Sequence, residues 1–410
     1  MIRQDQLARI ADSQKEDFIT KTSLITRECL MEITDLESFA TLITGIRRCG
    51  KSTLLQQVIR LKYPDAFFLN FEDIRLAGFD VSDFSRLYNE IKRRSVSVVF
   101  LDEPQLADKW EIFVHQLLRE NFRVYITGSN ATLLSREMGT HLTGRNLPFE
   151  LYPFSFNEFL NMKGLERSAD SLHEYLIRGG MPEYLKCGQS QVLNRLIDDI
   201  LVRDIAVRQS VRDISTLRQL TVYLLSNVAN LVSATGMTGM FGIKSPTTFL
   251  EYFSFLHDAY LFDFVPQFSW SQKVQSRNPK KIYAADNGFI TEVASVFTDN
   301  LGARFENLIY LHLRRKYSGI YYYKDKRECD FVVVDRNQAK EIVQACYNVD
   351  DLNFEREYTG LIQAMKFFNK KNGLIVTLNQ KDKFEKEGLT VTLLPAHEYL
   401  VLSPETLKLG

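Results

Sequence analysis

The chain has 410 residues, a length that predicts two or three domains rather than one. Hydrophobic residues make up 45% and charged residues 25%, as in ordinary globular proteins, while 51 basic and 51 acidic residues leave no net charge. A balanced total neither supports nor excludes nucleic-acid binding, which has to be argued from local clusters. Five scattered cysteines without CxxC spacing predict neither a disulfide framework nor a zinc site.

The chain lacks the sequence signals of secretion or membrane insertion. Its first eighteen residues are polar and charged, without the apolar core of a signal peptide. No stretch approaches the ~18–20 uninterrupted apolar residues of a membrane helix. We therefore expect a cytoplasmic protein with no membrane partner.

The first 150 residues alternate between helical and strand-like patterns. Residues 1–35 are predicted to form a helical lead-in, and residues 36–150 an α/β core. Short apolar runs, without polar alternation, predict strands near 40–44, 66–71, 96–101 and 123–127. Helical stretches separate these runs, which predicts a parallel sheet covered on both faces.

The pattern changes after about residue 150. Residues 151–209 are predicted to form a helical, lid-like region. Residues 210–290 follow the order of a winged-helix module, with three short helices before a strand-like run at 260–265. Residues 300–410 return to mixed α/β: a helix at 303–316, strands at 320–324, 329–334 and 341–347, a helix near 352–368 and a closing strand at 373–378. The predicted fold class is α/β throughout.

A phosphate-binding motif follows the first strand. Gly45 to Ser52, GIRRCGKS, fits the P-loop pattern GxxxxGK(S/T), with an apolar strand before it and an amphipathic helix after it. Glycines allow backbone N–H groups to face the phosphates, and the helix presents its positive end to them. Lys51 can reach the β- and γ-phosphates, and the Ser52 hydroxyl can bind Mg²⁺. The predicted ATP-binding residues here are Gly45, Arg47, Arg48, Cys49, Gly50, Lys51, Ser52 and Thr53.

Two adjacent acids supply the second half of the predicted site. Asp102 and Glu103 end the apolar run 98–101. We expect Asp102 to hold Mg²⁺ through water, and Glu103 to orient and activate the water that attacks ATP.

Further candidates follow the next strand. Ser129 or Asn130, at its tip, is predicted to sense the γ-phosphate or to position the water, although Gly, Ser and Asn also favour ordinary turns. Arg145 can stabilise transition-state charge, either within the subunit or on a neighbouring one. A surface arginine is the alternative interpretation.

These motifs form a recognisable series. GIRRCGKST, VVFLDEPQ, YITGSNATLLS, LTGR, LYPFSFNEFL and IRGGMPEYL precede KIYAADNGF, FENLIYLHLRR and ECDFVV. As a set, over roughly residues 30–380, they resemble prokaryotic AAA-superfamily ATPases that carry a C-terminal domain of unknown function. The resemblance implies an AAA-like core and a C-terminal domain similar to PD-(D/E)xK nucleases. It also implies Walker A roles for Lys51 and Ser52, Walker B roles for Asp102 and Glu103, a sensor strand at Ser129 and Asn130, and a functional Arg145.

The nuclease-like site is incomplete in the sequence. Glu306, on the predicted helix, and Asp330, on the next strand, suit the first two metal-binding acids. At the ExK position, Gln344 replaces the acid and Cys346 the lysine, and a thiol cannot supply the positive charge. We expect a residual site formed by Glu306, Asp330 and Gln344, or a nuclease-like domain that serves only as a binding module.

Two basic clusters in the C-terminal half suggest contact with DNA, although charge runs are usually solvated faces. One comprises Lys273, Arg277, Lys280 and Lys281, close to Trp270. The other comprises Arg304, Arg314, Arg315 and Lys316, then Lys324, Lys326 and Arg327, around the tyrosines at 321–323.

Taken together, the sequence predicts a magnesium-dependent ATPase that couples ATP turnover to DNA binding or remodelling. One alternative is a nucleotide-controlled switch with slow turnover and protein partners. A second alternative is an ATP-regulated, metal-dependent nuclease. Oligomers are common among AAA proteins, so a homo-oligomer is a further possibility.

Overall fold

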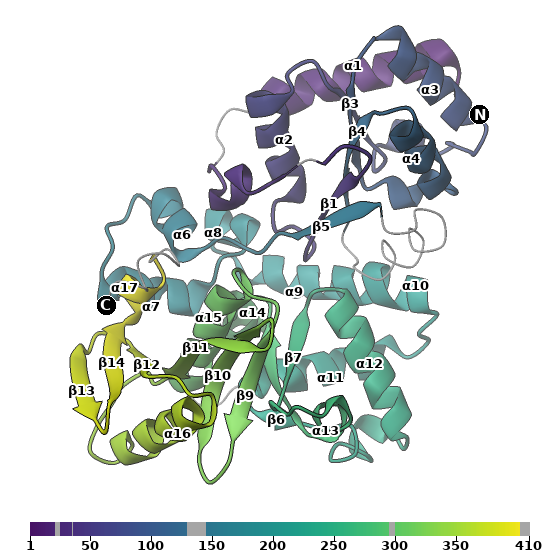
Figure 1. The fold of residues 1–410 in the computed structure, drawn as a ribbon. Coiled ribbons are helices and arrows are strands. Elements are labelled where there is room, and N and C mark those ends of the chain that lie inside the picture. The colour runs from purple at the N-terminus through teal and green to yellow at the C-terminus, as the bar shows by residue number, and fades with distance from the viewer. Residues whose placement is uncertain (21–24, 35, 129–144, 295–299, 402–410) are drawn as a thin grey trace. The chain divides into compact units, whose positions relative to one another are not determined.

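The computed structural model describes the whole chain except residues 21–24, 35, 129–144, 295–299 and 402–410. The chain forms two compact units, one of residues 1–152 with 258–260 and one of residues 153–257 with 261–410. Both units mix helices and sheets (Figure 1), which confirms the predicted α/β class.

The first unit is built on a five-stranded parallel sheet of order β2-β3-β4-β1-β5. Its strands are β1 (Ala40–Thr44), β2 (Phe67–Asn70), β3 (Val98–Asp102), β4 (Arg123–Thr127) and β5 (Asn146–Glu150). Strand β4 lies between β1 and β3, so the end of β4 faces both the loop after β1 and the acids after β3. This order determines which side chains meet at the site.

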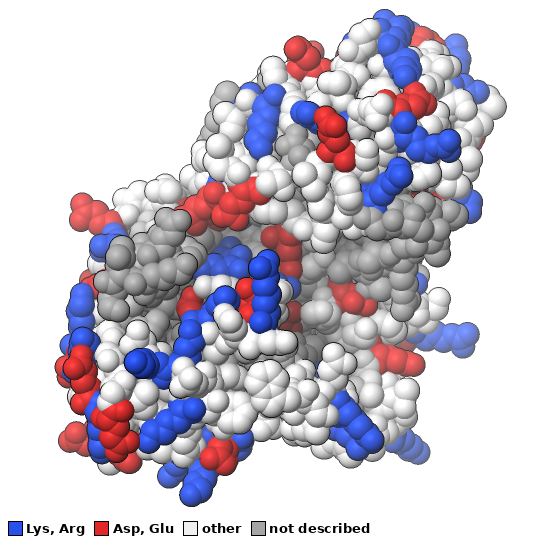
Figure 2. Space-filling view, viewed as in Figure 1, with Lys and Arg blue, Asp and Glu red and all other residues white. Residues whose placement is uncertain are grey.

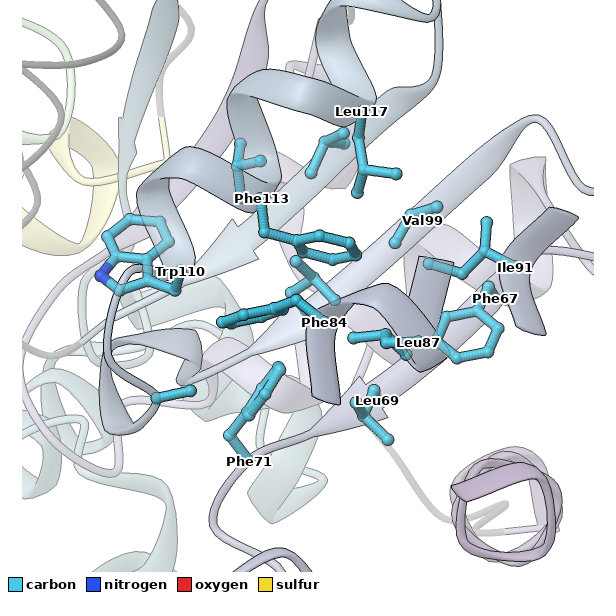
Figure 3. Packing of buried hydrophobic residues seen from close by; sticks show 14 of the residues in the cluster. Phe67, Leu69, Phe71, Phe84, Leu87, Ile91, Val99, Trp110, Phe113 and Leu117 are labelled. Carbon is cyan, nitrogen blue, oxygen red and sulfur yellow. The ribbon is translucent and has the colours of Figure 1, made fainter. Parts of the chain in front are cut away.

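Helices cover both faces of this sheet. The helical segments are α1 (Gln4–Thr20), η1 (Glu28–Met31), α2 (Lys51–Lys62), η2 (Ile74–Leu76), α3 (Asp83–Arg93), η3 (Pro104–Leu106) and α4 (Trp110–Arg119). On one face, α3 and α4 pack on Phe67, Leu69 and Val99, and the rings of Phe84 and Phe113 stack 4.8 Å apart (Figure 3). Alternation along the strands turns Phe68, Phe100 and Tyr125 to the other face.

The second unit begins with helices and a small sheet. Its helical segments here are α6 (Phe156–Lys163), α7 (Ala169–Arg178), α8 (Pro182–Cys187), α9 (Ser190–Asp199), η4 (Ile200–Ala206), α10 (Val207–Gln209), α11 (Ile214–Ser226), η5 (Met240–Gly242), α12 (Pro246–Asp258), α13 (Gln272–Arg277) and α14 (Asn287–Val293). Helix α6 starts with a capping box of Ser155 and Glu158, and the Asp213 side chain caps α11. Strands β6 (Leu231–Val232), β8 (Lys280–Ala284) and β7 (Phe262–Pro266) form an antiparallel sheet in that order.

A six-stranded mixed sheet completes the second unit, in the order β13-β14-β12-β11-β10-β9. Its elements are α15 (Leu301–Arg314), β9 (Ile320–Lys324), β10 (Glu328–Asp335), β11 (Gln338–Ala345), α16 (Phe354–Phe367), β12 (Asn372–Thr377), β13 (Asp382–Lys386), β14 (Leu389–Pro395) and α17 (Ala396–Tyr399). Strands β9 to β11 pair antiparallel, whereas β11, β12 and β14 run parallel.

The sequence prediction missed several strands, among them β5, β13 and β14. It placed the last strand at 373–378, but β13 and β14 follow, and β14 pairs with β12. The charged, mostly exposed residues of β13 conceal its strand character. Strand β5 was not predicted because it contains Pro148, which a strand at the edge of a sheet tolerates.

Neither the division into five segments nor the winged-helix module is tested by these observations, and both stay predictions. Among the helices that the structure describes, none has the length and apolar content to cross a membrane.

Candidate functional site

The loop between β1 and α2 has the backbone geometry of a tight phosphate-binding turn. Gly45 and Gly50 have φ angles of 135° and 105°, which L-residues rarely adopt. A Cβ on Gly45 would lie 2.2 Å from the Leu151 carbonyl oxygen, so the backbone needs glycine there. Arg48, exposed at the turn, also has a positive φ of 63°. The loop leads into α2 through Lys51, Ser52 and Thr53.

The predicted phosphate-binding lysine lies inside this loop. The Lys51 ammonium is buried and donates to the carbonyl oxygens of Gly45, at 3.0 Å, and Ile46, at 3.1 Å. Arg47 forms an ion pair with Glu72, with 3.7 Å between Nη1 and Oε1. The loop therefore concentrates positive charge beside its backbone N–H groups.

Arg27, which the sequence prediction missed, holds the loop from behind. Its buried guanidinium donates to the carbonyls of Cys49, at 2.9 Å, and Tyr152, at 2.7 Å. The Cys49 thiol donates to the Leu151 carbonyl at 3.3 Å, and burial raises the pKa of this thiol. Cys49 is thus a packing residue whose backbone carbonyl anchors the loop. Since Arg27 precedes the motif by 18 residues and lies outside regular structure, no periodic pattern could have identified it.

Three side chains, those of Ser52, Asp102 and Thr127, meet the backbone of Glu103 beside the loop. Ser52 Oγ lies 3.2 Å from Asp102 Oδ1, and the Thr127 hydroxyl donates to the same oxygen. The Glu103 N–H in turn donates to Thr127 Oγ1 at 3.0 Å. Thr127, at the end of β4, was not among the predicted residues. The only sequence signal for it is a polar residue that ends an apolar strand.

The two acids have distinct environments. Burial raises the pKa of Asp102, although hydrogen bonds from Thr127 and Ser52 oppose the shift. Burial also raises the pKa of Glu103, against the attraction of Lys51. Glu103 has a left-handed backbone (φ 51°), which is uncommon outside glycine, and its carboxylate accepts a hydrogen bond from the Gln105 amide. The chain thus turns sharply at the residue predicted to activate water.

The remaining predicted residues lie apart from this group or outside the described residues. Ser129 and Asn130, the two predicted sensor residues, fall outside the described residues. Arg145 is exposed and immediately precedes β5, where its carbonyl accepts the Ala40 N–H. That is the opposite end of the strands from Gly45, about 20 Å away over six residues of extended chain. The predicted role of the arginine, within its own subunit or on a neighbouring one, stays a prediction.

The predicted residual nuclease-like residues do come together, but around a lysine. Lys281, from β8, lies 2.9 Å from Glu306 on α15 and 2.8 Å from Asp330 on β10. Gln344 accepts the Asp330 N–H at 3.2 Å and donates to Glu357 at 2.5 Å. Among the described residues, no group of His, Cys, Asp or Glu side chains has an arrangement suited to a metal ion.

Several members of the predicted basic clusters are not surface residues. Lys281 is only 3% exposed and Arg304 only 7%. Arg315 donates to the carbonyls of Pro153 and Phe154, and Lys316 to His312. Lys324, Lys326 and Arg327 are exposed, as are Lys273 and Arg277. The clusters are therefore smaller at the surface than the sequence predicted, because Lys281 and Arg315 have polar partners distant in the chain and Lys316 has one on its own helical turn.

Two protein-family models match the chain, each over a different part. Residues 37–160 match the model of an AAA domain, and residues 169–300 match a domain of unknown function, DUF8612. The first match contains the loop, both acids and Thr127.

Two uncharacterized proteins are similar over most of the chain. MJ1544 of Methanocaldococcus jannaschii is 32% identical over 89% of this chain and 87% of its own length. A Haemophilus influenzae protein is 30% identical over 86% of this chain and 92% of its own length. Among solved structures, the chain is similar to one from the complex of S. cerevisiae Hsp104 with casein. The match covers 67% of this chain and 61% of that chain, at 13% identity and a TM-score of 0.28.

Proposed function

Since the chain belongs to the same family as MJ1544 and the H. influenzae protein, and its residues 37–160 match an AAA domain, we propose that it binds ATP with Mg²⁺ and hydrolyses it at the γ-phosphate. The observation that carries the proposal is the hydrogen-bonded series Ser52–Asp102–Thr127–Glu103 beside the loop. It joins the helix after the loop to the ends of two neighbouring strands.

The residues present suit a nucleotide with its magnesium ion. The Ser52 hydroxyl and the Asp102 carboxylate lie 3.2 Å apart, and both are the hard oxygen donors that Mg²⁺ prefers. These two residues would hold the ion, whose chemistry is to neutralise charge on the β- and γ-phosphates. Lys51 would exchange its loop carbonyls for phosphate oxygens, since an ammonium donor gains from a charged acceptor.

Glu103 is the residue we assign to the attacking water. A base whose pKa is raised toward neutrality accepts a proton more effectively than an ordinary carboxylate. In the proposed step the water oxygen bonds to the γ-phosphorus, and a proton of the water passes to Glu103. The bond from the γ-phosphorus to the β,γ-bridging oxygen breaks, and ADP leaves with that oxygen. Thr127 is a positioning residue, because it fixes the Glu103 backbone and the Asp102 carboxylate together.

Two substitutions test this proposal. Lys51→Ala should abolish high-affinity ATP binding, since it removes the charge paired with the phosphates. Glu103→Gln should retain ATP binding but lower the turnover rate by about 10²- to 10⁴-fold, the usual contribution of a general base. Equilibrium binding of a fluorescent ATP analogue and phosphate release under saturating ATP measure the two effects.

Asp108→Asn is the matched control, because this exposed acid lies five residues after Glu103. Its binding and turnover should equal those of the wild type. Unchanged ATP affinity in Lys51→Ala would refute the assignment of the loop, and normal turnover in Glu103→Gln would refute the assignment of the base.

We further propose that turnover is coupled to DNA. The support is a polar cleft of about 880 Å³ in the second unit, whose lining includes the exposed Lys324, Lys326, Arg327 and Arg356. Outside this cleft, Trp270 is 67% exposed and its ring meets that of Phe268 edge-on. Exposed cations suit phosphate contact, and an exposed aromatic ring suits base stacking.

The test is the ATPase rate with single-stranded, duplex and branched DNA, with Glu103→Gln as the blank. Stimulation by one form, lost in Lys326→Glu/Arg327→Glu, would support the DNA-coupled ATPase. A slow rate that no DNA changes would instead favour the alternative, a nucleotide-controlled switch with protein partners.

A further inference from the structure

The second unit contains a buried lysine whose charged group lies among three acids. Lys281 is buried, and its ammonium lies within 2.9 Å of three carboxylates: Glu306, Glu328 and Asp330. The ammonium donates hydrogen bonds to Glu306 and Asp330 and forms an ion pair with Glu328. Three negative charges thus surround one buried positive charge.

We infer that the ammonium of Lys281 is the resident cation of the polar cleft described above, in the position that a divalent metal ion would need. It follows that the C-terminal sheet does not form a metal-dependent nuclease. Glu306 on α15 and Asp330 on β10 are the two acids that such a site would require. Both direct an oxygen at the lysine instead.

Both acids accept further hydrogen bonds, and a neighbouring side chain is also engaged. Tyr283 donates to Glu306 Oε1 at 2.7 Å, and the Ala345 N–H donates to Asp330 Oδ2 at 3.0 Å. Gln344 spans from the Asp330 backbone to Glu357. A metal ion would have to displace several of these bonds as well as the lysine.

The backbone of Lys281 cannot easily withdraw. Strand β8 is the central strand of its sheet, and Lys281 pairs with Leu231 on β6 and with Val265 on β7. Withdrawing the backbone of Lys281 would break the pairing on both sides of β8. The strand therefore keeps the Cα of the lysine beside the three acids.

This inference does not depend on the ATPase proposal, and it is tested on the full chain without nucleotide. In EDTA, Lys281→Met should have a lower Tm than the wild type, because three carboxylates lose their shared cation. Mn²⁺ should then raise the Tm of Lys281→Met, since a ligand that binds the folded state stabilises it. The rise should disappear in Lys281→Met/Asp330→Asn, and should be absent from the wild type.

Lys280→Met is the matched control, since it removes the neighbouring lysine of the same strand. It should keep the wild-type response to Mn²⁺. If Lys281→Met does not fold, Mn²⁺ binding to the wild type is measured by electron paramagnetic resonance, with Asp330→Asn for comparison. Bound Mn²⁺ that Asp330→Asn removes would overturn the inference, and equal low binding in both would support it. A Lys281→Met protein that keeps its Tm in EDTA, or that loses Tm without responding to Mn²⁺, would also overturn it.

Discussion

At the scale of single residues, the site depends on side chains that make two contacts at once. Thr127 donates to Asp102 and accepts from the Glu103 N–H. Arg27 joins the loop to residue 152. Each such residue fixes two backbone segments. Its loss should therefore change the geometry of the site more than the free energy of unfolding.

Thr127→Val tests this at nearly constant volume. The change removes hydrogen bonds to charged or catalytic groups, each with a value of about 1.5–3 kcal/mol, so the ATPase rate should fall by roughly 10- to 100-fold. ATP affinity should change much less, because Lys51 and the loop are unaltered. Thr127→Ser keeps the hydroxyl and should retain the rate. A normal rate in Thr127→Val would remove Thr127 from the site.

His312 should make stability depend on pH. It is buried on α15, its Nε2 lies 2.9 Å from Lys316 Nζ, and burial together with Lys316 and Arg315 holds its pKa well below 6.5. Below about pH 6.5 the unfolded chain gains a proton that the folded chain does not. The free energy of unfolding should therefore fall with decreasing pH, by up to about 1.4 kcal/mol per pH unit.

Urea unfolding between neutral and mildly acidic pH measures this dependence. His312→Gln should have a shallower slope than the wild type, whereas His173→Gln, which changes an exposed histidine of the same unit, should not. Equal slopes in all three proteins would show that His312 protonates freely in the folded state.

Residues within a continuous motif could be predicted from the sequence, whereas residues whose partners are distant in the chain could not. Lys51, Ser52, Asp102 and Glu103 were predictable because the loop and the strand that carry them are continuous in sequence. Thr127 and Arg27 depend on strand order and on an irregular segment, which no local pattern reveals. Lys281 was predicted to lie on the surface, because its three carboxylate partners come from segments 25 to 49 residues away.

At the scale of elements, two motifs of the second unit form one junction. The Gly180 N–H donates to Asp286 Oδ2 at 2.6 Å, and the Gly288 N–H donates to Asp286 Oδ1 at 2.9 Å. Asn287 donates to the carbonyls of Leu176 and Arg304, which ties α14 to α7 and α15. These motifs, GGMP and DNGF, thus hold helices together and need no catalytic explanation.

Gly180→Ala tests the junction. Its Cβ would lie 2.2 Å from the Phe154 carbonyl oxygen, so the backbone must shift, at a cost of about 1–3 kcal/mol or more in the free energy of unfolding. Gly302→Ala is the control, since its Cβ would meet only Asn300 Oδ1, at 3.7 Å, within helix α15. Urea unfolding should show a loss for the first variant and none for the second. A neutral Gly180→Ala would mean that the junction adapts without strain.

At the scale of the whole molecule, charge is distributed without a dominant sign. Figure 2 shows basic and acidic side chains interspersed over the face that it draws, as the zero net charge would suggest. Any attraction of DNA must then come from limited groups such as Lys326 and Arg327, and it should be strongly weakened by salt.

The two compact units should respond differently to nucleotide. The loop, both acids and Thr127 belong to the first unit, so a non-hydrolysable ATP analogue should raise the thermal transition of that unit alone. Scanning calorimetry should resolve two transitions, and Lys51→Ala should abolish the shift. A single transition that moves as a whole would show that the units unfold cooperatively.

The segment that ends the first unit shares its hydrogen bonds with the nucleotide loop. Leu151 accepts from the Cys49 thiol and lies against Gly45, while Tyr152 accepts from Arg27, which also holds Cys49. Pro153 follows at once and restricts the backbone of Tyr152. A rearrangement of the loop would therefore have to break these hydrogen bonds or carry Leu151 and Tyr152 with it. The nucleotide loop and the point where the chain leaves the first unit thus form one hydrogen-bonded assembly.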